Sequence, residues 1–378
     1  MAASRTPSAR KATVFAVLPP PTTGMTLCTR LIADRLAAIG AVGELNLSDG
    51  SAKITLSFRV AKFFRTLGAL LRLLSGASRG GALYMSVNAR RAMWYNIAAA
   101  AAARLWGSRV AAHHHIYAYI TKPDWRVKLL DRVMGPSGVH VVLCDDMQSH
   151  LKSLYGCRAG FLQLPSTVMM TGGADDATQD SSESTEEPFG GQREFRVGHL
   201  ANLSYDKGID HVFGVFSKLL ESHDSVKLVL AGPVMDAEAR ERLAGAQRDY
   251  PDRLDYRGPV YGADKEAFFR DIDLLLLPSR FDAQPVVISE AFERAKPVLA
   301  IGWSCIPGLI GPNDSWNICP KANYVDKASG VIENWITRPD EYQSASQRAL
   351  ERAAELRRDA QHDLDAFCEW VFPGAAAV

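Results

Sequence analysis

A repeating alternation of apolar strands and amphipathic helices most constrains the fold of this chain. Short apolar runs occur throughout its 378 residues. We expect strands at 13–18, 82–86, 109–113, 139–144, 195–198, 226–231, 254–256, 272–277 and 296–300. Strands that alternate with helices form a parallel sheet with helices on both faces. The sequence therefore predicts a doubly wound α/β architecture.

A change of composition divides the alternation into two parts. Residues 172–188 are acidic, rich in serine and almost free of large apolar side chains. Such a segment cannot bury enough surface to offset its ordering entropy. We expect a flexible linker or insertion at 169–193, between domains at 1–168 and 194–355. A helix over about 344–372 ends the chain, and its last part, 356–378, is expected to return to the first domain.

The charge is distributed unevenly, although the net charge is only +1. Residues 1–165 hold 21 Lys and Arg against 7 Asp and Glu, and the remainder holds 22 against 35. The 74 positions between Asp49 and Asp124 carry 11 basic residues and no acidic residue. Two parts of opposite sign suit different partners, so the first part is expected to meet an anionic one.

Several classes of protein are disfavoured. No apolar run reaches the roughly 20 residues of a membrane span, and residues 1–11 lack an apolar secretory core. The six cysteines are scattered without a Cys-x-x-Cys pair, which indicates neither a disulfide framework nor a zinc site. We expect a cytoplasmic protein without a nucleic-acid partner.

The strongest candidate site follows the strand at 272–277. Asp282 lies in the loop after this strand, and Glu290 lies eight positions later on the next helix. In open α/β sheets, ligands bind at the carboxyl ends of strands, and amides at a helix N-terminus face anions. The corner therefore suits a ligand with hydroxyls at one end and phosphate at the other. A helix that merely carries a carboxylate near its start is the alternative.

This corner resembles the E-x7-E signature of retaining glycosyltransferases of family 4, which have the GT-B fold. Asp282 stands at the first Glu and Gln284 at the usual aromatic residue, followed by Pro285 and Val286. The resemblance implies that Glu290 binds the ribose hydroxyls of a nucleotide sugar. It also implies that Asp282 holds a hydroxyl of the donor sugar.

A second match follows the strand at 195–198. Lys207-Gly208 resembles the Lys-Gly loop that holds the donor diphosphate in this family. The upstream basic partner is replaced by Asn202, so Arg280 is expected to supply the second positive charge. The segment around Pro259 resembles the one whose backbone contacts the nucleotide base. The alternative for Lys207 is a solvated side chain before a capping glycine.

Two motifs of the first domain complete the resemblance. Gly24 ends a Pro-rich loop after the first strand, where the backbone would approach the donor. His115, with His114 as second choice, follows the strand at 109–113 and is implied to touch the donor sugar. A metal site is not expected there, because adjacent strand residues point to opposite faces. A histidine without a functional role is the alternative.

The resemblance implies two Rossmann-like domains that face each other across a cleft. It implies a retaining, metal-independent glycosyltransferase that uses a UDP- or GDP-sugar and no cofactor, by front-face attack. The expected acceptor is a lipid-linked glycan in polysaccharide assembly. A GT-B protein that binds nucleotide sugars without transfer, and a nucleotide-sugar epimerase, stay open as alternatives.

An amphipathic helix in the first domain suggests where that acceptor is met. Its apolar residues form one stripe, and its basic residues lie off that stripe. The apolar residues are Leu56, Val60, Phe63, Phe64, Leu67, Leu70, Leu71 and Leu74. The basic residues are Arg59, Lys62, Arg65 and Arg72. Such a helix either faces the core or lies on a membrane. Because acidic residues are missing around it, we expect it to lie on an anionic membrane, peripheral to the inner face of the plasma membrane.

Overall fold

The computed structural model describes residues 11–20, 22–48, 50, 56–172, 189, 193–311, 317–318 and 323–374. The chain divides into two compact units. Unit 1 comprises residues 1–172 and 359–378, and unit 2 comprises residues 173–358. Most of the expected linker, at 173–188 and 190–192, lies outside the described residues.

Unit 1 is built on a parallel sheet of six strands in the order β2-β1-β3-β4-β5-β6. The strands are β1 (Lys11–Ala16), β2 (Ala41–Asn46), β3 (Ala82–Ser86), β4 (Arg109–His113), β5 (Val139–Val142) and β6 (Gly160–Gln163). The inner strands β3 and β5 are buried at every position. Burial on both faces favours apolar side chains along a strand, and these two strands are apolar apart from Ser86 and His140.

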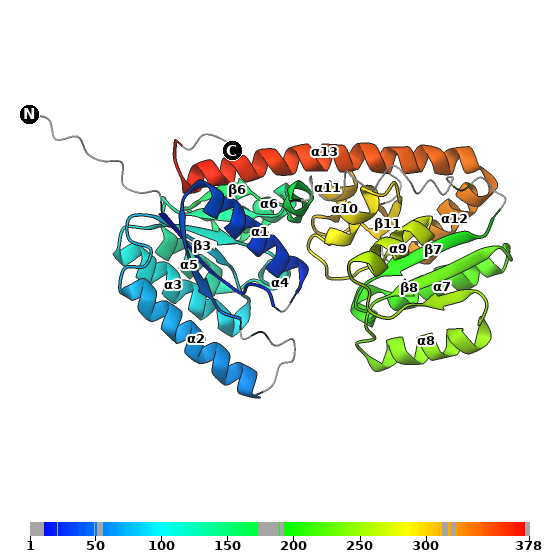
Figure 1. The fold of residues 1–378 in the computed structure, drawn as a ribbon, viewed down its shortest axis with the longest axis horizontal. Coiled ribbons are helices and arrows are strands. Elements are labelled where there is room, and N and C mark those ends of the chain that lie inside the picture. The colour runs from blue at the N-terminus through cyan, green and yellow to red at the C-terminus, as the bar shows by residue number, and fades with distance from the viewer. Residues whose placement is uncertain are drawn as a thin grey trace, which may run out of the picture. The chain divides into compact units, whose positions relative to one another are not determined.

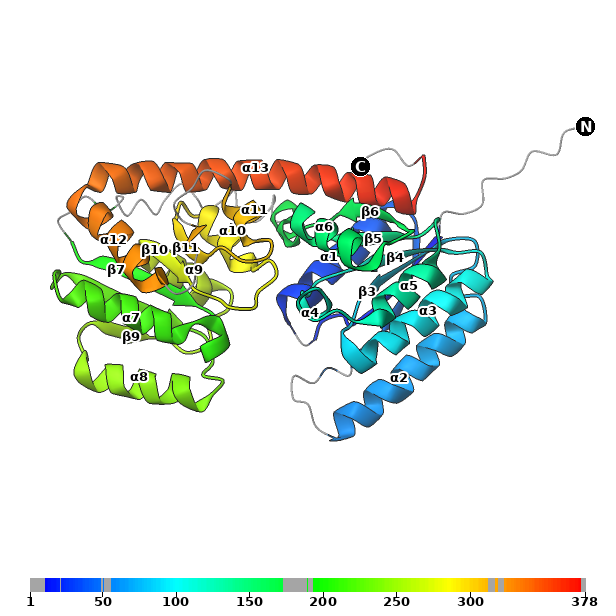
Figure 2. The ribbon, with the colours of Figure 1, turned by 180° about the vertical axis from the view of Figure 1, so that it is seen from behind.

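Helices cover both faces of this sheet. They are α1 (Gly24–Ile39), α2 (Leu56–Leu74), α3 (Met93–Leu105), α4 (Ala118–Thr121), α5 (Trp125–Met134) and α6 (Asp145–Tyr155), with 3-10 turns η1 (Arg90–Ala92) and η2 (Ser166–Thr171). α3 contacts both α2 and α5 on one face (Figure 2). α1 packs on the core with the end of the C-terminal helix.

Unit 2 repeats the architecture with the strand order β12-β11-β10-β7-β8-β9. Its strands are β7 (Phe195–Leu200), β8 (Val226–Ala231), β9 (Leu254–Tyr256), β10 (Leu274–Leu277), β11 (Val298–Ile301) and β12 (Asn317–Ile318). Its helices are η3 (Tyr205–Lys207), α7 (Ile209–Leu220), α8 (Ala237–Asp249), α9 (Ala263–Asp271), α10 (Val286–Phe292), α11 (Ile306–Ile310) and α12 (Tyr324–Thr337).

The last helix, α13 (Pro339–Val371), contributes to both units (Figure 1). In unit 2, the Tyr342 hydroxyl donates to the carbonyl oxygen of Asp273. In unit 1, Leu364 and Phe367 are buried in the core beside β1 and β3. The expected return of the C-terminal helix to the first domain is confirmed.

The strands that the sequence analysis missed all lie at sheet edges. β2 and β6 are the two edges of the first sheet, and β12 is an edge of the second. Only one of the six residues of β2 is buried. No helix of the described residues is long and apolar enough to cross a membrane.

Candidate functional site

The corner between β10 and α10 lies at the topological switch point of the second sheet. β7 and β10 are neighbours, but the chain continues from β7 to β8 on one side and from β10 to β11 on the other. Loops that leave the carboxyl ends of two such strands form the ligand-binding crevice of open α/β sheets. Asp282 lies in the loop after β10 and Glu290 lies on α10, so both expected carboxylates belong to this place.

Close backbone contact joins the loop after β7 to the loop after β10. Gly208 has a φ of +76°, and a Cβ atom there would lie 2.2 Å from the carbonyl oxygen of Pro278. The Arg280 N–H also donates to the carbonyl oxygen of Asp206 at 2.9 Å. A glycine is therefore required after Lys207 for the two loops to meet.

Lys207 and Asp282 form an ion pair across these loops. The Ser204 hydroxyl accepts from the Lys207 N–H and caps η3. Both charged side chains are partly exposed, the lysine at 28% and the aspartate at 23%. An incoming anion can thus reach the ammonium group, but it has to share it with Asp282 or displace that carboxylate.

Glu290 has a partner that the sequence analysis missed. The Lys265 ammonium group, on α9, lies 2.5 Å from Glu290 Oε1. The two residues lie 25 positions apart on different helices, so no local pattern marks their pairing. Asp282 and Glu290 are consequently both neutralised by lysines.

Arg280, which is expected to supply the second positive charge, pairs with Asp210 at the start of α7. Its guanidinium makes two bonds to the Asp210 carboxylate, of 2.9 and 2.7 Å. It also donates to the Tyr205 carbonyl oxygen at 2.5 Å and stacks over the Tyr205 ring. Planar guanidinium groups favour such bidentate and stacked contacts. Arg280 therefore holds the Lys-Gly loop to the start of α7.

The remaining expected donor-binding residues surround the same sheet edge. Gly232 lies close to two other strand ends: a Cβ atom there would lie 1.8 Å from the Ala201 carbonyl oxygen, and its N–H donates to Gly258 at 2.7 Å. Asn202 and Pro259, which follow these contacts, are exposed. Gln284, Pro285 and Val286, at the start of α10, are half-buried. No side chain of the described residues caps the N-terminus of this helix.

His199 is a second residue that the sequence analysis missed. It is fully buried near the end of β7, and its Nδ1–H donates to the Leu276 carbonyl oxygen of β10 at 2.9 Å. Its buried Nε2 has no hydrogen-bond partner among the described residues. Burial lowers the pKa of His199 to about 4, so the ring is neutral. A histidine that follows Val197 and Gly198 near the end of a mostly buried strand was the available signal.

In unit 1, Gly24 lies at the first residue of α1. Thr23 caps this helix, and a reciprocal bond to Thr26 completes a capping box. β1 precedes the helix and lies between β2 and β3, at the switch point of the first sheet. The exposed Gly24 thus lies where a βα unit ordinarily meets a ligand.

The three consecutive histidines have different environments. His113 contacts the Tyr84 hydroxyl at 2.7 Å and the Leu164 carbonyl oxygen at 3.1 Å. His114 contacts the Tyr119 hydroxyl at 2.7 Å and His140 at 2.9 Å. Only His115 has a buried nitrogen without a partner in the described part of the chain. Burial lowers the pKa of His115 to about 4.

These contacts separate the first choice from the second. His114 is buried and both of its ring nitrogens bind within unit 1, so it has a structural role. His115 keeps an unused acceptor or donor and stays the candidate.

Most of unit 2 is similar in sequence to known glycosyltransferases. The family described as glycosyl transferases group 1 matches residues 182–352. The alpha-monoglucosyldiacylglycerol synthase of Streptococcus pneumoniae is 25% identical over 159 residues, which cover 41% of this chain and 35% of that protein. An uncharacterized glycosyltransferase of Methanocaldococcus jannaschii is 28% identical over 121 residues, covering 29% and 27%. The matched segments thus span between about a quarter and a third of these relatives' length.

Solved structures resemble the whole chain. Anabaena HepE in complex with UDP has a TM-score of 0.64 at 15% identity and covers 94% of this chain and 100% of that one. The sucrose-phosphate synthase of Thermosynechococcus elongatus has a TM-score of 0.63 at 12% identity, covering 92% and 95%. The OtsA apo structure has a TM-score of 0.65 at 13% identity, covering 96% and 98%. The chain has the GT-B fold, as expected: two parallel α/β units and a C-terminal helix.

Proposed function

We propose that this chain is a retaining glycosyltransferase of family 4, which transfers a sugar from a UDP- or GDP-sugar to an acceptor hydroxyl. The observation that carries the proposal is the meeting of Lys207 and Asp282 at the switch point of unit 2. This corner lies inside the segment that matches the glycosyl transferases group 1 family. Anabaena HepE, which shares the fold, was solved with UDP and UDP-glucose.

Each residue of the corner has a proposed task. Lys207 binds the diphosphate and stabilises the charge that develops on it as the glycosidic bond breaks. Glu290 accepts hydrogen bonds from the ribose hydroxyls, and Asp282 holds a hydroxyl of the sugar. The acceptor hydroxyl attacks the anomeric carbon from the face that the diphosphate leaves. The departing diphosphate oxygen takes the proton of that hydroxyl. The roles expected for Gly24 and His115 stay predictions.

A panel of nucleoside diphosphate sugars tests the proposal. A matching donor should raise the melting temperature, because a ligand that binds only the folded state stabilises it. The same donor should then be consumed in the presence of acceptor lipids, with retention of the anomeric configuration and without loss of activity in EDTA. Donor binding without transfer would favour a binding protein, and isomerisation without acceptor would favour an epimerase.

The outer face of α2 supports a membrane-bound acceptor. Over residues 62–74, whose side chains the structure describes, the apolar stripe does not face the core: Phe64 is 63% exposed and Leu71 is 58% exposed. The helix instead buries Thr66, Ala69 and Leu73. An exposed apolar helix face in an acid-free region is typical of attachment to anionic lipid. We infer that unit 1 binds the surface of an anionic membrane and takes a lipid-linked acceptor there.

Liposome cosedimentation checks this inference. The protein should sediment with anionic liposomes more than with neutral ones, and less at high salt, because salt screens the attraction. Equal and negligible sedimentation with both would indicate a soluble acceptor.

A further inference from the structure

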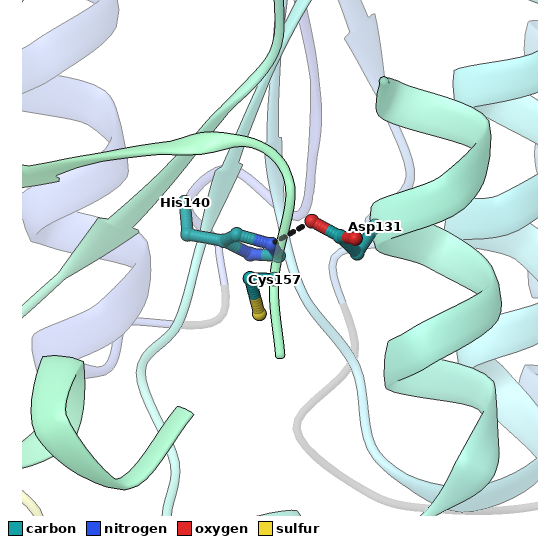
Figure 3. Close-up of side chains that lie close together, drawn as sticks. All are labelled: Asp131, His140 and Cys157. Carbon is teal, nitrogen blue, oxygen red and sulfur yellow. Dashed lines mark hydrogen bonds and ion pairs between the residues drawn. The ribbon is translucent and has the colours of Figure 1, made fainter. Parts of the chain in front are cut away.

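A cluster of three potential metal ligands lies in unit 1, outside the site discussed above. Asp131 belongs to α5, His140 to β5 and Cys157 to the segment between α6 and β6 (Figure 3). One ligand atom of each lies within 4.8 Å of the others. Carboxylate oxygen, imidazole nitrogen and thiolate sulfur are the donors that Zn²⁺ takes in proteins.

The spacing of the first two ligands is slightly shorter than that of two atoms bound to one ion, so a small separation would admit the ion. His140 Nε2 lies 3.2 Å from Asp131 Oδ1. Two atoms bound to zinc at about 2.0–2.2 Å and at the tetrahedral angle lie roughly 3.3–3.6 Å apart. The Cys157 side chain lies beside this pair (Figure 3), and its thiol donates to the Leu151 carbonyl oxygen at 3.6 Å. Because a thiol is a weak donor, a turn of the sulfur towards the pair costs little.

Further contacts hold both ligands in position. The Asp131 carboxylate accepts the N–H groups of Arg158 at 2.9 Å and Ala159 at 3.0 Å. On the other side of the His140 ring, Nδ1 lies 2.9 Å from His114 Nε2. Metal-binding histidines commonly use their second nitrogen in this way, which fixes the tautomer and the ring orientation.

We propose that Asp131, His140 and Cys157 bind one Zn²⁺ ion, which ties α5 and β5 to the segment between α6 and β6. Binding releases the Cys157 thiol proton to solvent. The His140 ring changes tautomer, so that Nε2 binds the ion and Nδ1–H donates to His114 Nε2, whose own proton moves to Nδ1 beside the Tyr119 hydroxyl. Carboxylate, thiolate and neutral imidazole then offset the charge of the ion. Two anionic ligands make the buried site neutral overall, which limits its desolvation cost. Because these residues supply three ligands and Cys157 is only half buried, a water completes the tetrahedron.

Metal content and cobalt absorption test the proposal on the full chain. After incubation with zinc and gel filtration, the wild type should retain one zinc per chain. Cys157→Ala should bind zinc more than about tenfold more weakly, whereas Cys368→Ala, which removes another free thiol, should bind like the wild type. The Co²⁺ form should show a thiolate charge-transfer band that only Cys157→Ala loses. Zinc should also raise the melting temperature of the wild type and not of Cys157→Ala.

The opposite results identify a purely structural pair. If zinc is retained at well below one per chain, or equally by Cys157→Ala and the wild type, then Asp131 and His140 only join α5 to β5. Absence of the cobalt–thiolate band would also overturn the proposal. None of these measurements depends on transferase activity, so they are independent of the proposed function.

Discussion

The two candidate carboxylates at the switch point of unit 2 each have a lysine partner, and this pairing determines what single substitutions will do. Lys207 pairs with Asp282, and Lys265 pairs with Glu290. These four side chains sum to zero charge before a ligand arrives. A diphosphate must therefore compete with Asp282 for the Lys207 ammonium group. Removal of Lys207 should weaken diphosphate binding, whereas removal of the Asp282 charge should strengthen it.

Lys207→Ala should weaken the binding of UDP or GDP by about 1.5–3 kcal/mol, the range of a hydrogen bond to a charged group. Calorimetric titration with both nucleotides measures the change. Lys218→Ala is a matched control, because the Lys218 ammonium group pairs with the exposed Asp326 of α12. Unchanged affinity in Lys207→Ala would contradict the assignment of the diphosphate site.

Asp282→Asn should have the opposite effect on nucleotide binding. It frees Lys207 from a partly exposed ion pair, which is worth up to about 1 kcal/mol. UDP or GDP should then bind up to about fivefold more tightly, while sugar transfer slows because the charged contact to the sugar is lost. Calorimetric titration measures the nucleotide affinity, and initial rates measure sugar transfer. Weaker nucleotide binding would show that Asp282 contacts the nucleotide itself.

Glu290→Ala should abolish most sugar transfer with little change in stability. The Lys265 partner is 30% exposed and the glutamate is 23% exposed, so the pair contributes only about 0–1 kcal/mol to folding. The kcat/KM for the donor and the melting temperature should be measured together. Glu293→Ala, which breaks the neighbouring pair with Arg357, should retain activity. Near-normal transfer by Glu290→Ala would make the signature match accidental.

At the scale of elements, burial decided what could be predicted. Interior strands such as β3 and β8 are mostly apolar, with Ser86 and Lys227 as their polar residues, and their residues match the expected ranges. The edge strand β2 contains Gly43 and Glu44, both exposed, so its sequence does not look like a strand. For α2, the period of the apolar residues was correct, but a period cannot tell an inward face from an outward one.

The exposed face of α2 can be tested by adding charge to it. Phe64→Glu and Leu67→Glu should each lower cosedimentation with anionic liposomes, because a carboxylate replaces buried apolar contact with lipid and is repelled by the surface. Both sites are exposed, so folding should be nearly unchanged. Leu105→Glu, at a 75% exposed position on α3, is the control. Equal binding by all three variants would locate the contact elsewhere.

At the scale of the whole molecule, the sequence predicted the repeated βα architecture but not the contacts that complete the site. The partners Lys207 and Asp282 are 75 positions apart, and their meeting depends on the strand order of unit 2. The ion pair of Arg280 with Asp210 depends in turn on how the loop after β10 meets the start of α7. Residue types and local spacing carry no record of such pairings, because they arise from topology.

Buried neutral histidines in both units predict that acid will destabilise the protein. Burial lowers the pKa of His115 in unit 1 and of His199 in unit 2 to about 4, whereas an unfolded histidine has a pKa of about 6.5. Between these values the unfolded chain binds more protons than the folded chain. The free energy of unfolding therefore falls as the pH drops from about 6.5 towards 4, by up to about 1.4 kcal/mol per pH unit for each histidine.

Urea unfolding of wild type and His199→Gln at several pH values measures this dependence. A glutamine amide can still donate to the Leu276 carbonyl oxygen, but it does not titrate. Between pH 6.5 and 5, the free energy of unfolding should fall less for the variant than for the wild type. The difference should approach the contribution of one histidine, which is up to about 1.4 kcal/mol per pH unit. Parallel curves for the two proteins would mean that His199 does not stay neutral in the folded state, and its buried Nε2 would then need an anionic partner.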